Sequence, residues 1–392
     1  MMNPARYLLI LALAISLAQS SSLADTQPQP TCQNPTIRVA IINDQNFVRL
    51  YIKDPYKIYA ANSGKVLLKG PCIETKIISV KDGLLIRDKR FKVTGVRIKA
   101  GKDATVYVDK KPFRGAIDIV KKENGKLMVI NRVGLEDYLY GVLCHEVSHK
   151  WPMEALKAQA IAARTFALYQ VRQNKIQPYD LRNDIYSQVY GGSDFEKRST
   201  TMAVDATRGK VLTYKGDLLQ AYYHAACSGG TENASTLWKV DSPPLRGVPC
   251  DFCFGSPHYR WIKDIPLWSL EEKMKAGGYK IGRIASVAVI SKNSSGRVEK
   301  LEIRDSNGVS LVLTGKDFRQ LMGPNEVRST KFEASVKWGQ LLLDGRGWGH
   351  GVGMCQWGAF GQAKQDKKVD EILKHYYPGA EITTIDKIID KL

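Results

Sequence analysis

The sequence predicts an α+β fold with a β-rich N-terminal part, a helical central segment and a further strand meander near the C-terminal end. Short apolar runs alternate with polar residues and turn residues from residue 37 to about residue 133, which is the period of β-strands. Apolar and small residues then recur at helical spacing over 135–143 and 152–173. Alternation returns over 285–313, interrupted by Ser-Gly and Asn-Gly turns that are typical of hairpins. Short helices are also expected over 265–277 and near 369–376.

The N-terminal residues have the composition of a secretory signal. Arg6 precedes an apolar run from Tyr7 to Ala18, and small residues follow at Ser22 and Ala24. The run is shorter than the ~20 residues of a membrane span, so a retained anchor is the less favoured alternative. We expect an exported protein of the periplasm or cell wall, with membrane association through an uncleaved signal as the alternative.

The rest of the chain is divided by composition. We expect a signal peptide over 1–24, a polar, Pro-containing leader over 25–36, a β-rich N-terminal domain over 37–130 and a second domain over 131–392. The hydrophobic content of 44% is ordinary for a globular protein and excludes disorder for most of the chain.

The chain is strongly basic. Lys and Arg number 58 against 39 Asp and Glu, a formal net charge of +19, so the surface attracts polyanions at long range. An exported protein meets the cell wall and anionic lipid, so we expect no nucleic-acid partner. Peptidoglycan suits the charge, because its lactyl and stem-peptide groups are carboxylates. The charge is spread along the chain, so much of it is also explained as solvated surface.

The stretch CHEVSHKWP over 144–152 contains His145, Glu146 and His149 in the H-E-x-x-H pattern of zinc peptidases. A peptidase site needs both histidines on one continuous helix. Pro152 opposes this, because it disfavours helix at Trp151 and marks a new helix start. A metal-free general acid and base, with the pKa of Glu146 raised beside apolar groups, is a second interpretation. A solvated loop carboxylate is the third, and residue type alone favours it.

A cluster of cysteine and histidine lies further along the chain. His224 and Cys227 form H-x-x-C, and Cys250 and Cys253 form C-x-x-C, which together offer two chelating pairs for a closed, tetrahedral, structural zinc site. His258 is the substitute fourth ligand. A disulfide from Cys227 to Cys250 or Cys253 is the alternative in an oxidising compartment.

Four further cysteines are informative only in pairs. Cys32 and Cys72 lie alone in the N-terminal third, where a disulfide is their simplest use. Cys144 and Cys355 either pair with each other or stay as buried free thiols.

The segment GVLCHEVSHKWPMEALKAQAIAARTFAL over 141–168 resembles the core of the stage II sporulation protein D family. Further segments that resemble the family follow in the family's order: SQVYGG (187–192), AYYH (221–224), SGRV (295–298), RSTKF (328–332) and GRGWGHGVGMCQWGA (345–359). The resemblance covers nearly all of the expected mature chain. One departure is the dipeptide Val147-Ser148, where the family has Met-Pro.

The resemblance implies a lytic transglycosylase that cleaves peptidoglycan glycan strands, preferring strands already stripped of stem peptides by an amidase. The resemblance implies that Glu146 is the family's essential acidic residue and that residues 131–392 form the catalytic domain. One carboxyl suffices, because the C6 hydroxyl of the sugar attacks C1 and leaves a 1,6-anhydro end, whereas ordinary glycosidases need two carboxyls. The resemblance also allows a noncatalytic, wall-binding modifier of an amidase. It further implies zinc held by His and Cys, with His224 at the family's position.

The family's polar positions imply substrate contacts at Gln159, Arg164, Gln188, Tyr190, His350 and Gln356. Gln159 and Arg164 are five residues apart on one helix, about 140° around its axis, so both cannot face one ligand. Arg164 has the alternative of holding a buried carboxylate or backbone carbonyl. Gln188 and Tyr190 would share one face of a strand.

Overall fold

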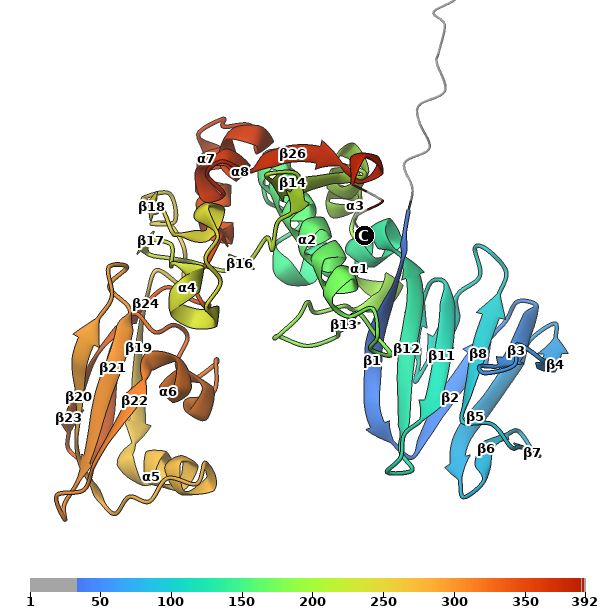
Figure 1. Cartoon of the computed structure of the whole chain (residues 1–392), viewed down its shortest axis with the longest axis horizontal. Helices are drawn as coiled ribbons and strands as arrows, with labels where there is room; N and C mark the ends of the chain where they lie inside the picture. Colours follow the sequence, from blue (N-terminus) through green and yellow to red (C-terminus); the bar gives the residue numbers. More distant parts are fainter. Residues whose placement is uncertain (1–33, 389, 391–392) are drawn as a thin grey trace, which may run out of the picture. The chain divides into compact units, whose positions relative to one another are not determined.

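The computed structural model describes residues 34–388 and residue 390. The expected signal peptide, all but the last residues of the expected leader, and Cys32 lie outside the described residues, so the predicted disulfide between Cys32 and Cys72 stays a prediction. Figure 1 shows the elements in chain order. The α+β fold class is confirmed, with a strand-rich N-terminal region followed by mixed helices and strands.

Two sheets form the N-terminal region, and their strands are antiparallel apart from one short parallel pair at the edge of the larger sheet. A seven-stranded sheet has the order β13-β1-β12-β11-β8-β3-β4, and a six-stranded sheet has the order β10-β9-β2-β5-β6-β7. The strands of these sheets are β1 (Thr36–Gln45), β2 (Phe47–Ile52), β3 (Tyr56–Ala60), β4 (Val66–Gly70), β5 (Ile73–Val80), β6 (Gly83–Ile86), β7 (Lys89–Phe91), β8 (Gly95–Ala100), β9 (Val106–Val108), β10 (Lys111–Phe113), β11 (Ala116–Lys121), β12 (Leu127–Gly134) and β13 (Leu181–Arg182). The alternation predicted from the sequence is clearest in β2, where every second residue is buried.

The inward faces of both sheets belong to one apolar cluster, which also includes Leu135, Tyr138 and Leu139 of the first helix. The predicted domain boundary at residue 130 falls inside β12, which pairs with β1 and β11 along its length. The first helix therefore follows directly from a central strand of the sheet and packs on the same core.

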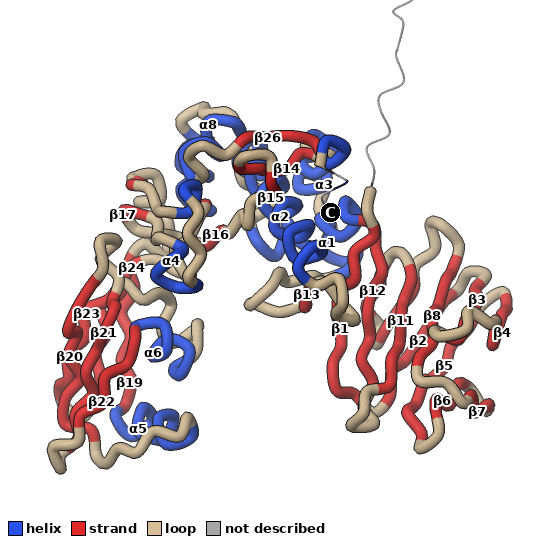
Figure 2. The backbone as a smooth tube through the Cα atoms, in the orientation of Figure 1, coloured by secondary structure: helices blue, strands red, loops and turns tan. Residues whose placement is uncertain are grey.

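The helical segment contains α1 (Leu135–Glu146), α2 (Met153–Gln173) and α3 (Arg198–Ala206). Helix α1 runs three residues further than predicted and ends at Glu146, while α2 begins after Pro152 as expected. Figure 2 shows the helices of this segment in blue. Gln188 and Tyr190, predicted to lie on a strand, are in an irregular loop.

Short strands and helices make up the remainder: β14 (Lys210–Tyr214), β15 (Asp217–Leu218), β16 (Tyr223–His224), β17 (Gly229–Gly230), α4 (Ala234–Trp238), β18 (Pro249–Cys250), β19 (Arg260–Pro266), α5 (Leu267–Ala276), β20 (Ile284–Lys292), β21 (Val298–Asp305), β22 (Ser310–Thr314), α6 (Gly315–Met322), β23 (Phe332–Lys337), β24 (Gln340–Arg346), β25 (Met354–Cys355), α7 (Gln356–Lys364), α8 (Val369–Tyr376) and β26 (Glu381–Thr384). Strands β20, β21 and β22 form the predicted antiparallel meander. Helices α5 and α8 lie where short helices were predicted.

Helix α7 begins inside the Gly-rich segment 345–359, where no helix was predicted. A Cβ atom on Gly358 would lie 1.9 Å from the Tyr376 hydroxyl, and one on Gly361 would lie 2.0 Å from the carbonyl oxygen of Phe252. Glycine is therefore required for close packing at these positions, although it lowers helix propensity. Among the described residues, no helix has the length and apolarity needed to cross a membrane.

Candidate active site

Glu146 lines a cleft with a volume of about 600 Å³. It is the last residue of α1, and the chain leaves the helix at Val147 in an extended conformation. The negative end of the helix dipole lies there, which disfavours an ionised carboxylate. The end of the helix thus positions the side chain and destabilises its charge.

The carboxyl of Glu146 has a strongly altered acidity. Burial raises its pKa to about 7, and hydrogen bonds with Gln356 and Tyr223 oppose the rise. The Gln356 Nε2 atom donates to Glu146 Oε2 at 3.3 Å. A carboxyl with a pKa near neutrality can give a proton and later accept one at the same pH, as acid–base catalysis requires.

A chain of hydrogen bonds leads from the protein interior to Glu146 through Tyr223. Gln188 Nε2 donates to the Tyr223 hydroxyl at 2.8 Å, and Gln188 Oε1 accepts from the Tyr138 hydroxyl at 2.9 Å. Gln188 is buried and does not line the cleft. Gln188 therefore acts on Glu146 through Tyr223, which differs from the sugar contact that the sequence predicted for it.

Two very short strands bring together the two residues that hydrogen-bond to Glu146. Strand β16 pairs in parallel with β25, so that Tyr223 lies beside Met354 and His224 beside Cys355. Gln356 follows at the first position of α7. This pairing delivers Tyr223 and Gln356 to the same carboxyl, although they are far apart in the sequence.

Aromatic side chains line the cleft next to Glu146. The rings of Tyr222 and Trp238 stack at 4.3 Å with an interplanar angle of 19°, and His350 packs edge-on against Trp238 at 5.0 Å. His350, predicted as a substrate contact, lines the cleft, and burial holds its pKa well below the usual range. Its imidazole is therefore neutral, and a neutral ring beside flat aromatic faces suits an uncharged sugar.

His224 also lines the cleft, in place of its predicted role as a metal ligand. Its Nδ1 atom lies 3.1 Å from the Val352 carbonyl oxygen, and burial and the charge of Arg297 lower its pKa to about 3. Among the described residues, its buried Nε2 atom has no hydrogen-bond partner. His224 thus offers a neutral imidazole with one nitrogen free for a ligand.

Cations from α6 line the same cleft. Lys316 donates to the Leu237 carbonyl oxygen, and Arg319 Nε donates to the Val327 carbonyl oxygen, both at 2.9 Å. Within the described part of the chain, neither side chain forms an ion pair with a carboxylate. The acids of the cleft are Glu146 and Asp184, and Asp184 lies 3.7 Å from Arg182. The cleft therefore combines one neutralised carboxyl with cations that lack an acidic partner.

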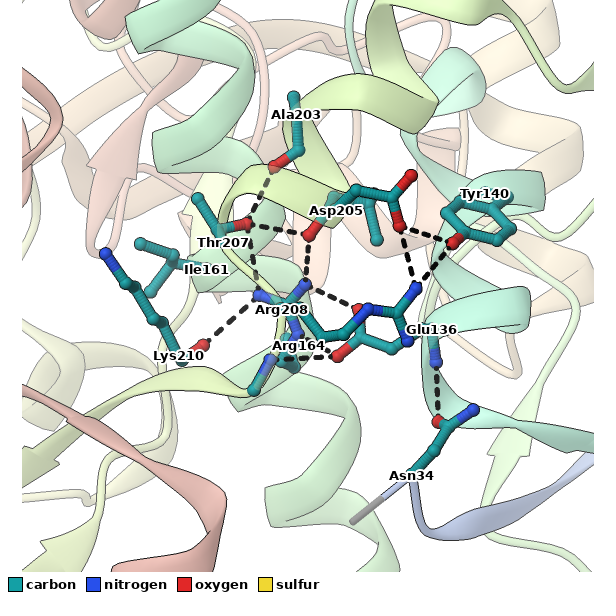
Figure 3. Close-up of polar contacts among 12 residues, drawn as sticks. Asn34, Glu136, Tyr140, Ile161, Arg164, Ala203, Asp205, Thr207, Arg208 and Lys210 are labelled. Atoms are coloured by element: carbon teal, nitrogen blue, oxygen red, sulfur yellow. Dashed lines mark hydrogen bonds and ion pairs between the residues drawn. The ribbon is translucent and has the colours of Figure 1, made fainter. Parts of the chain in front are cut away.

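The structure places Arg164 away from the cleft. Its guanidinium is fully buried and forms a two-pronged ion pair with Glu136, at 2.7 Å and 2.9 Å (Figure 3). It also donates to the carbonyl oxygens of Val204 and Lys210. Arg164 therefore holds a buried carboxylate and backbone carbonyls, which is the alternative that the sequence left open.

Two other predicted substrate contacts are also buried away from the cleft. The Tyr190 hydroxyl donates to Asn131 Oδ1 at 2.9 Å, and its ring packs against Tyr138. Gln159 is buried in α2, and among the described residues neither of its amide atoms has a hydrogen-bond partner. Of the predicted substrate residues, His350 and Gln356 reach the cleft.

The H-E-x-x-H pattern does not form a metal site. Helix α1 ends at Glu146, so His149 lies beyond the helix that holds His145. The ring of His145 instead packs against Phe195 at 4.4 Å. Within residues 34–388 and 390, the possible metal site is a group of cysteines elsewhere.

That group is Cys227, Cys250, Cys253 and Cys355, whose sulfur atoms all lie within 4.8 Å of one another. All are buried, and the sulfurs of Cys227 and Cys253 are 3.6 Å apart. Zinc–sulfur bonds of ≈ 2.3 Å place the sulfurs of a tetrahedral site about 3.8 Å apart, so the geometry suits zinc. Compared with the predicted ligand set, Cys355 takes the place of His224. The two residues are partners in the β16–β25 pair, but the sulfur belongs to the cluster and the imidazole lines the cleft.

Backbone N–H groups point at the sulfurs. Cys227 N and Gly358 N lie 3.3 and 3.2 Å from Cys355 Sγ, and Ser228 N lies 3.3 Å from Cys253 Sγ. Such donors stabilise thiolates, which are the form that binds metal. His258, the predicted substitute ligand, packs against Trp348 at 4.5 Å and lines the cleft.

No disulfide links the five described cysteines that follow residue 140, which are Cys144, Cys227, Cys250, Cys253 and Cys355. Cys144 lies 3.2 Å from the Thr200 hydroxyl, whereas Cys355 belongs to the four-cysteine group. The predicted pairing of Cys144 with Cys355 is therefore not observed.

Sequence reasoning missed several residues of the cleft. Tyr223 lies in the AYYH segment but was given no role, and Trp238 and Arg319 were not singled out. Each acquires its role only from its position in space. Cys355 also carried a usable signal, because a cysteine in a Gly-rich segment can approach other backbones closely.

Comparisons with known proteins agree with one another. A profile of a family described as Stage II sporulation protein matches residues 123–214, and a domain of unknown function matches residues 254–353. An uncharacterized protein of Brachyspira hyodysenteriae is 32% identical over 88% of the chain and 95% of its own length. Stage II sporulation protein D of Bacillus amyloliquefaciens is 31% identical over 67% of the chain and 78% of its own length. The amidase enhancer of Bacillus subtilis is 27% identical over 63% of the chain and 40% of its own length.

Proposed function

Because the chain belongs to the stage II sporulation protein D family, we propose that it is a peptidoglycan lytic transglycosylase with Glu146 as its single acid and base. The observation that carries the proposal is the pKa of Glu146, which burial raises to about 7 in a cleft lined by aromatic rings. The other acid of the cleft, Asp184, lies 3.7 Å from Arg182. The site therefore has one carboxyl suited to proton transfer.

In the proposed reaction, protonated Glu146 donates its proton to the oxygen between N-acetylmuramic acid and N-acetylglucosamine. The bond from that oxygen to C1 of the muramic acid breaks, and the C6 hydroxyl of the same sugar attacks C1. Ionised Glu146 accepts the proton of that hydroxyl, which restores the acid and closes the 1,6-anhydro ring. Hydrogen bonds from Gln356 and Tyr223 stabilise Glu146 while it is ionised.

The cations of α6 support a preference for strands without stem peptides. Removal of a stem peptide leaves a free lactyl carboxylate, and Lys316 and Arg319 offer unpaired charge in the cleft. Replacing Arg319 with Gln is expected to reduce kcat/KM on stripped strands by about tenfold, since one charge pair in a cleft is worth roughly 1–2 kcal/mol. Equal loss on stripped and peptide-bearing strands would contradict this assignment.

The direct test is product analysis by mass spectrometry. The mature protein, incubated with amidase-stripped glycan strands, should release fragments with 1,6-anhydro ends. Glu146→Gln should abolish them, and Asp184→Asn, the matched control at the other acid of the cleft, should keep them. Products with reducing ends, or equal losses in both variants, would instead indicate a two-carboxyl hydrolase.

A noncatalytic role is the second candidate, because one relative is named an amidase enhancer. In that case no fragments would form, and the protein would accelerate a peptidoglycan amidase equally well with Glu146→Gln. Loss of amidase stimulation in that variant would count against this candidate. On either candidate the partners are glycan strands and an amidase.

We also propose that the four cysteines hold a structural zinc ion. The ion would fix the loops around Cys227, Cys250 and Cys253 to Cys355, the residue before Gln356, and so stabilise the support of Glu146. It would take no part in proton transfer. About one zinc per chain is expected by metal analysis, lost in the double variant Cys250→Ser/Cys253→Ser and kept in the control Cys144→Ser. A native protein without zinc would remove the proposal.

Export through residues 1–24 completes the proposal, since peptidoglycan lies outside the cytoplasm. Cell fractionation tests it: deletion of residues 2–24 should leave the protein in the cytoplasm. An intact protein of unprocessed mass in the membrane fraction would favour the uncleaved anchor instead.

A further inference from the structure

We propose that the outer face of the six-stranded N-terminal sheet binds an anionic glycan strand, at a site separate from the cleft. The face is formed by β2 and its neighbours β5 and β9. It exposes Phe47, Arg49 and Tyr51 of β2, because the alternate residues of that strand point into the core. The choice of peptidoglycan as the ligand rests on the proposed function, but the chemistry of the face does not.

The face carries exposed aromatic rings. Phe47 is 38% exposed and Tyr51 is 42% exposed, and the Tyr51 ring packs at 5.4 Å against the ring of Tyr107, its partner on β9. Exposed aromatic side chains that lie side by side on a sheet are uncommon in the absence of a ligand. Their flat faces match the apolar C–H faces of sugar rings.

The same face carries cations without an acidic partner. Arg49 and Lys76 are directly opposite each other on β2 and β5. Like charges in this arrangement destabilise a sheet. Among the described residues, neither side chain pairs with a carboxylate. Both lie over the Phe47 ring, at 5.1 and 5.3 Å from its centroid. An anion bound beside the ring would offset the repulsion between them.

The shape of the face favours a linear polymer. Phe47 and Tyr51 are four residues apart on one strand, about 13 Å, so the rings span more than a single sugar. A glycan strand with lactyl carboxylates supplies sugar rings and negative charge at repeated intervals. The face therefore fits this ligand better than a small anion, which would leave the rings unused.

The test measures binding in the Glu146→Gln background, so that turnover does not interfere. The full mature protein is sedimented with insoluble, stem-peptide-free strands whose lactyl groups are either free carboxylates or methylamides. Arg49→Gln/Lys76→Gln should weaken binding to the free carboxylates by about tenfold and leave binding to the methylamides unchanged. Phe47→Ser/Tyr51→Ser should weaken binding to both. These exposed positions leave the core intact, and melting curves check folding.

Matched controls remove the same charge or an equally exposed ring elsewhere. Lys275→Gln/Lys280→Gln and Trp338→Ser, where Trp338 is 92% exposed, should bind like the parent. Binding that is unchanged in both sheet variants overturns the inference, as does an equal loss in the controls. Sheet-dependent capture by phosphatidylglycerol vesicles without capture by glycan also overturns it.

The outcome is independent of the proposed reaction. If the protein with Glu146 intact releases no anhydro fragments while the sheet variants still lose binding, the proposed enzyme fails and the inference stands. If fragments form but the sheet variants bind normally, the inference fails alone.

Discussion

Glu146 shows how a single side chain can be suited to catalysis at a cost in stability. Burial raises its pKa from an ordinary 4.5 to about 7. A carboxyl whose pKa is raised by folding contributes full stability below about pH 4.5, and this contribution falls as the pH rises through 7. The folded protein therefore carries an unfavourable buried charge under alkaline conditions.

The substitution Glu146→Gln should increase stability at pH 8, because the amide has the same shape but no charge. We expect an increase of roughly 1–3 kcal/mol at pH 8 and little difference at pH 5, where Glu146 is protonated. Urea unfolding at both pH values measures this. The control is Asp184→Asn, which should give the same small difference at both. A destabilisation by Glu146→Gln at pH 8 would show that the carboxylate is well solvated or paired.

Tyr223 tunes the acidity of Glu146 through a hydrogen bond that favours the ionised carboxylate. Tyr223→Phe removes this bond, so the pKa of Glu146 should rise further. On the proposed mechanism, kcat/KM falls with rising pH as Glu146 ionises. This alkaline limb of the pH–rate profile should lie near pH 7 in the native protein and at higher pH in the variant. Phe166→Leu, another change of an aromatic residue lining the cleft, should leave the limb in place. A loss of rate without a shift of the limb would limit Tyr223 to substrate contact.

At the scale of elements, one buried ion pair joins α1 to α2. Arg164 and Glu136 are almost fully buried and bonded through both prongs, and Glu136 also accepts from Gly209 N. Figure 3 shows that carbonyl oxygens of neighbouring turns complete the arrangement. Since α1 ends at Glu146, this pair fixes the helix that presents the proposed catalytic carboxyl.

Arg164→Met should therefore destabilise the protein by about 3–5 kcal/mol, because it leaves Glu136 charged and buried without a partner. The double variant Arg164→Met/Glu136→Leu should recover much of this loss. The exposed pair of Arg246 and Asp241 provides the control, and Arg246→Met should change the free energy of unfolding by less than about 1 kcal/mol. An Arg164→Met protein of native stability with a raised KM would return Arg164 to the substrate site.

At the scale of the whole molecule, the fold class and the order of elements could be predicted because alternation and helical spacing are local. Helix α7 could not, since its glycines have poor helix propensity and are explained only by contacts with Phe252 and Tyr376. Glu146, His350 and Gln356 were expected at the site and line one cleft. Arg164 was misplaced because a polar residue in an Ala-rich helix has the same sequence pattern whether it faces a ligand or a buried acid.

The cysteine site was predicted with one ligand exchanged. His224 and Cys355 are partners across β16 and β25, and this pairing of short parallel strands has no signature in either segment. Spacing in the sequence therefore identified the two cysteine-bearing loops, but only the fold decided which neighbour completes the cluster.

The net charge of +19 acts on every step that brings the protein to an anionic polymer. Raising the ionic strength from 0.01 to 0.15 M shortens the screening length from about 30 to about 8 Å. On stripped strands, kcat/KM should fall by about tenfold over this range, while kcat stays constant because Glu146, partly buried in the cleft, is weakly screened. Strands with methylamidated lactyl groups are the control and should show little dependence on salt. An equal salt dependence on both strands, or a change confined to kcat, would mean that long-range attraction does not limit encounter with the substrate.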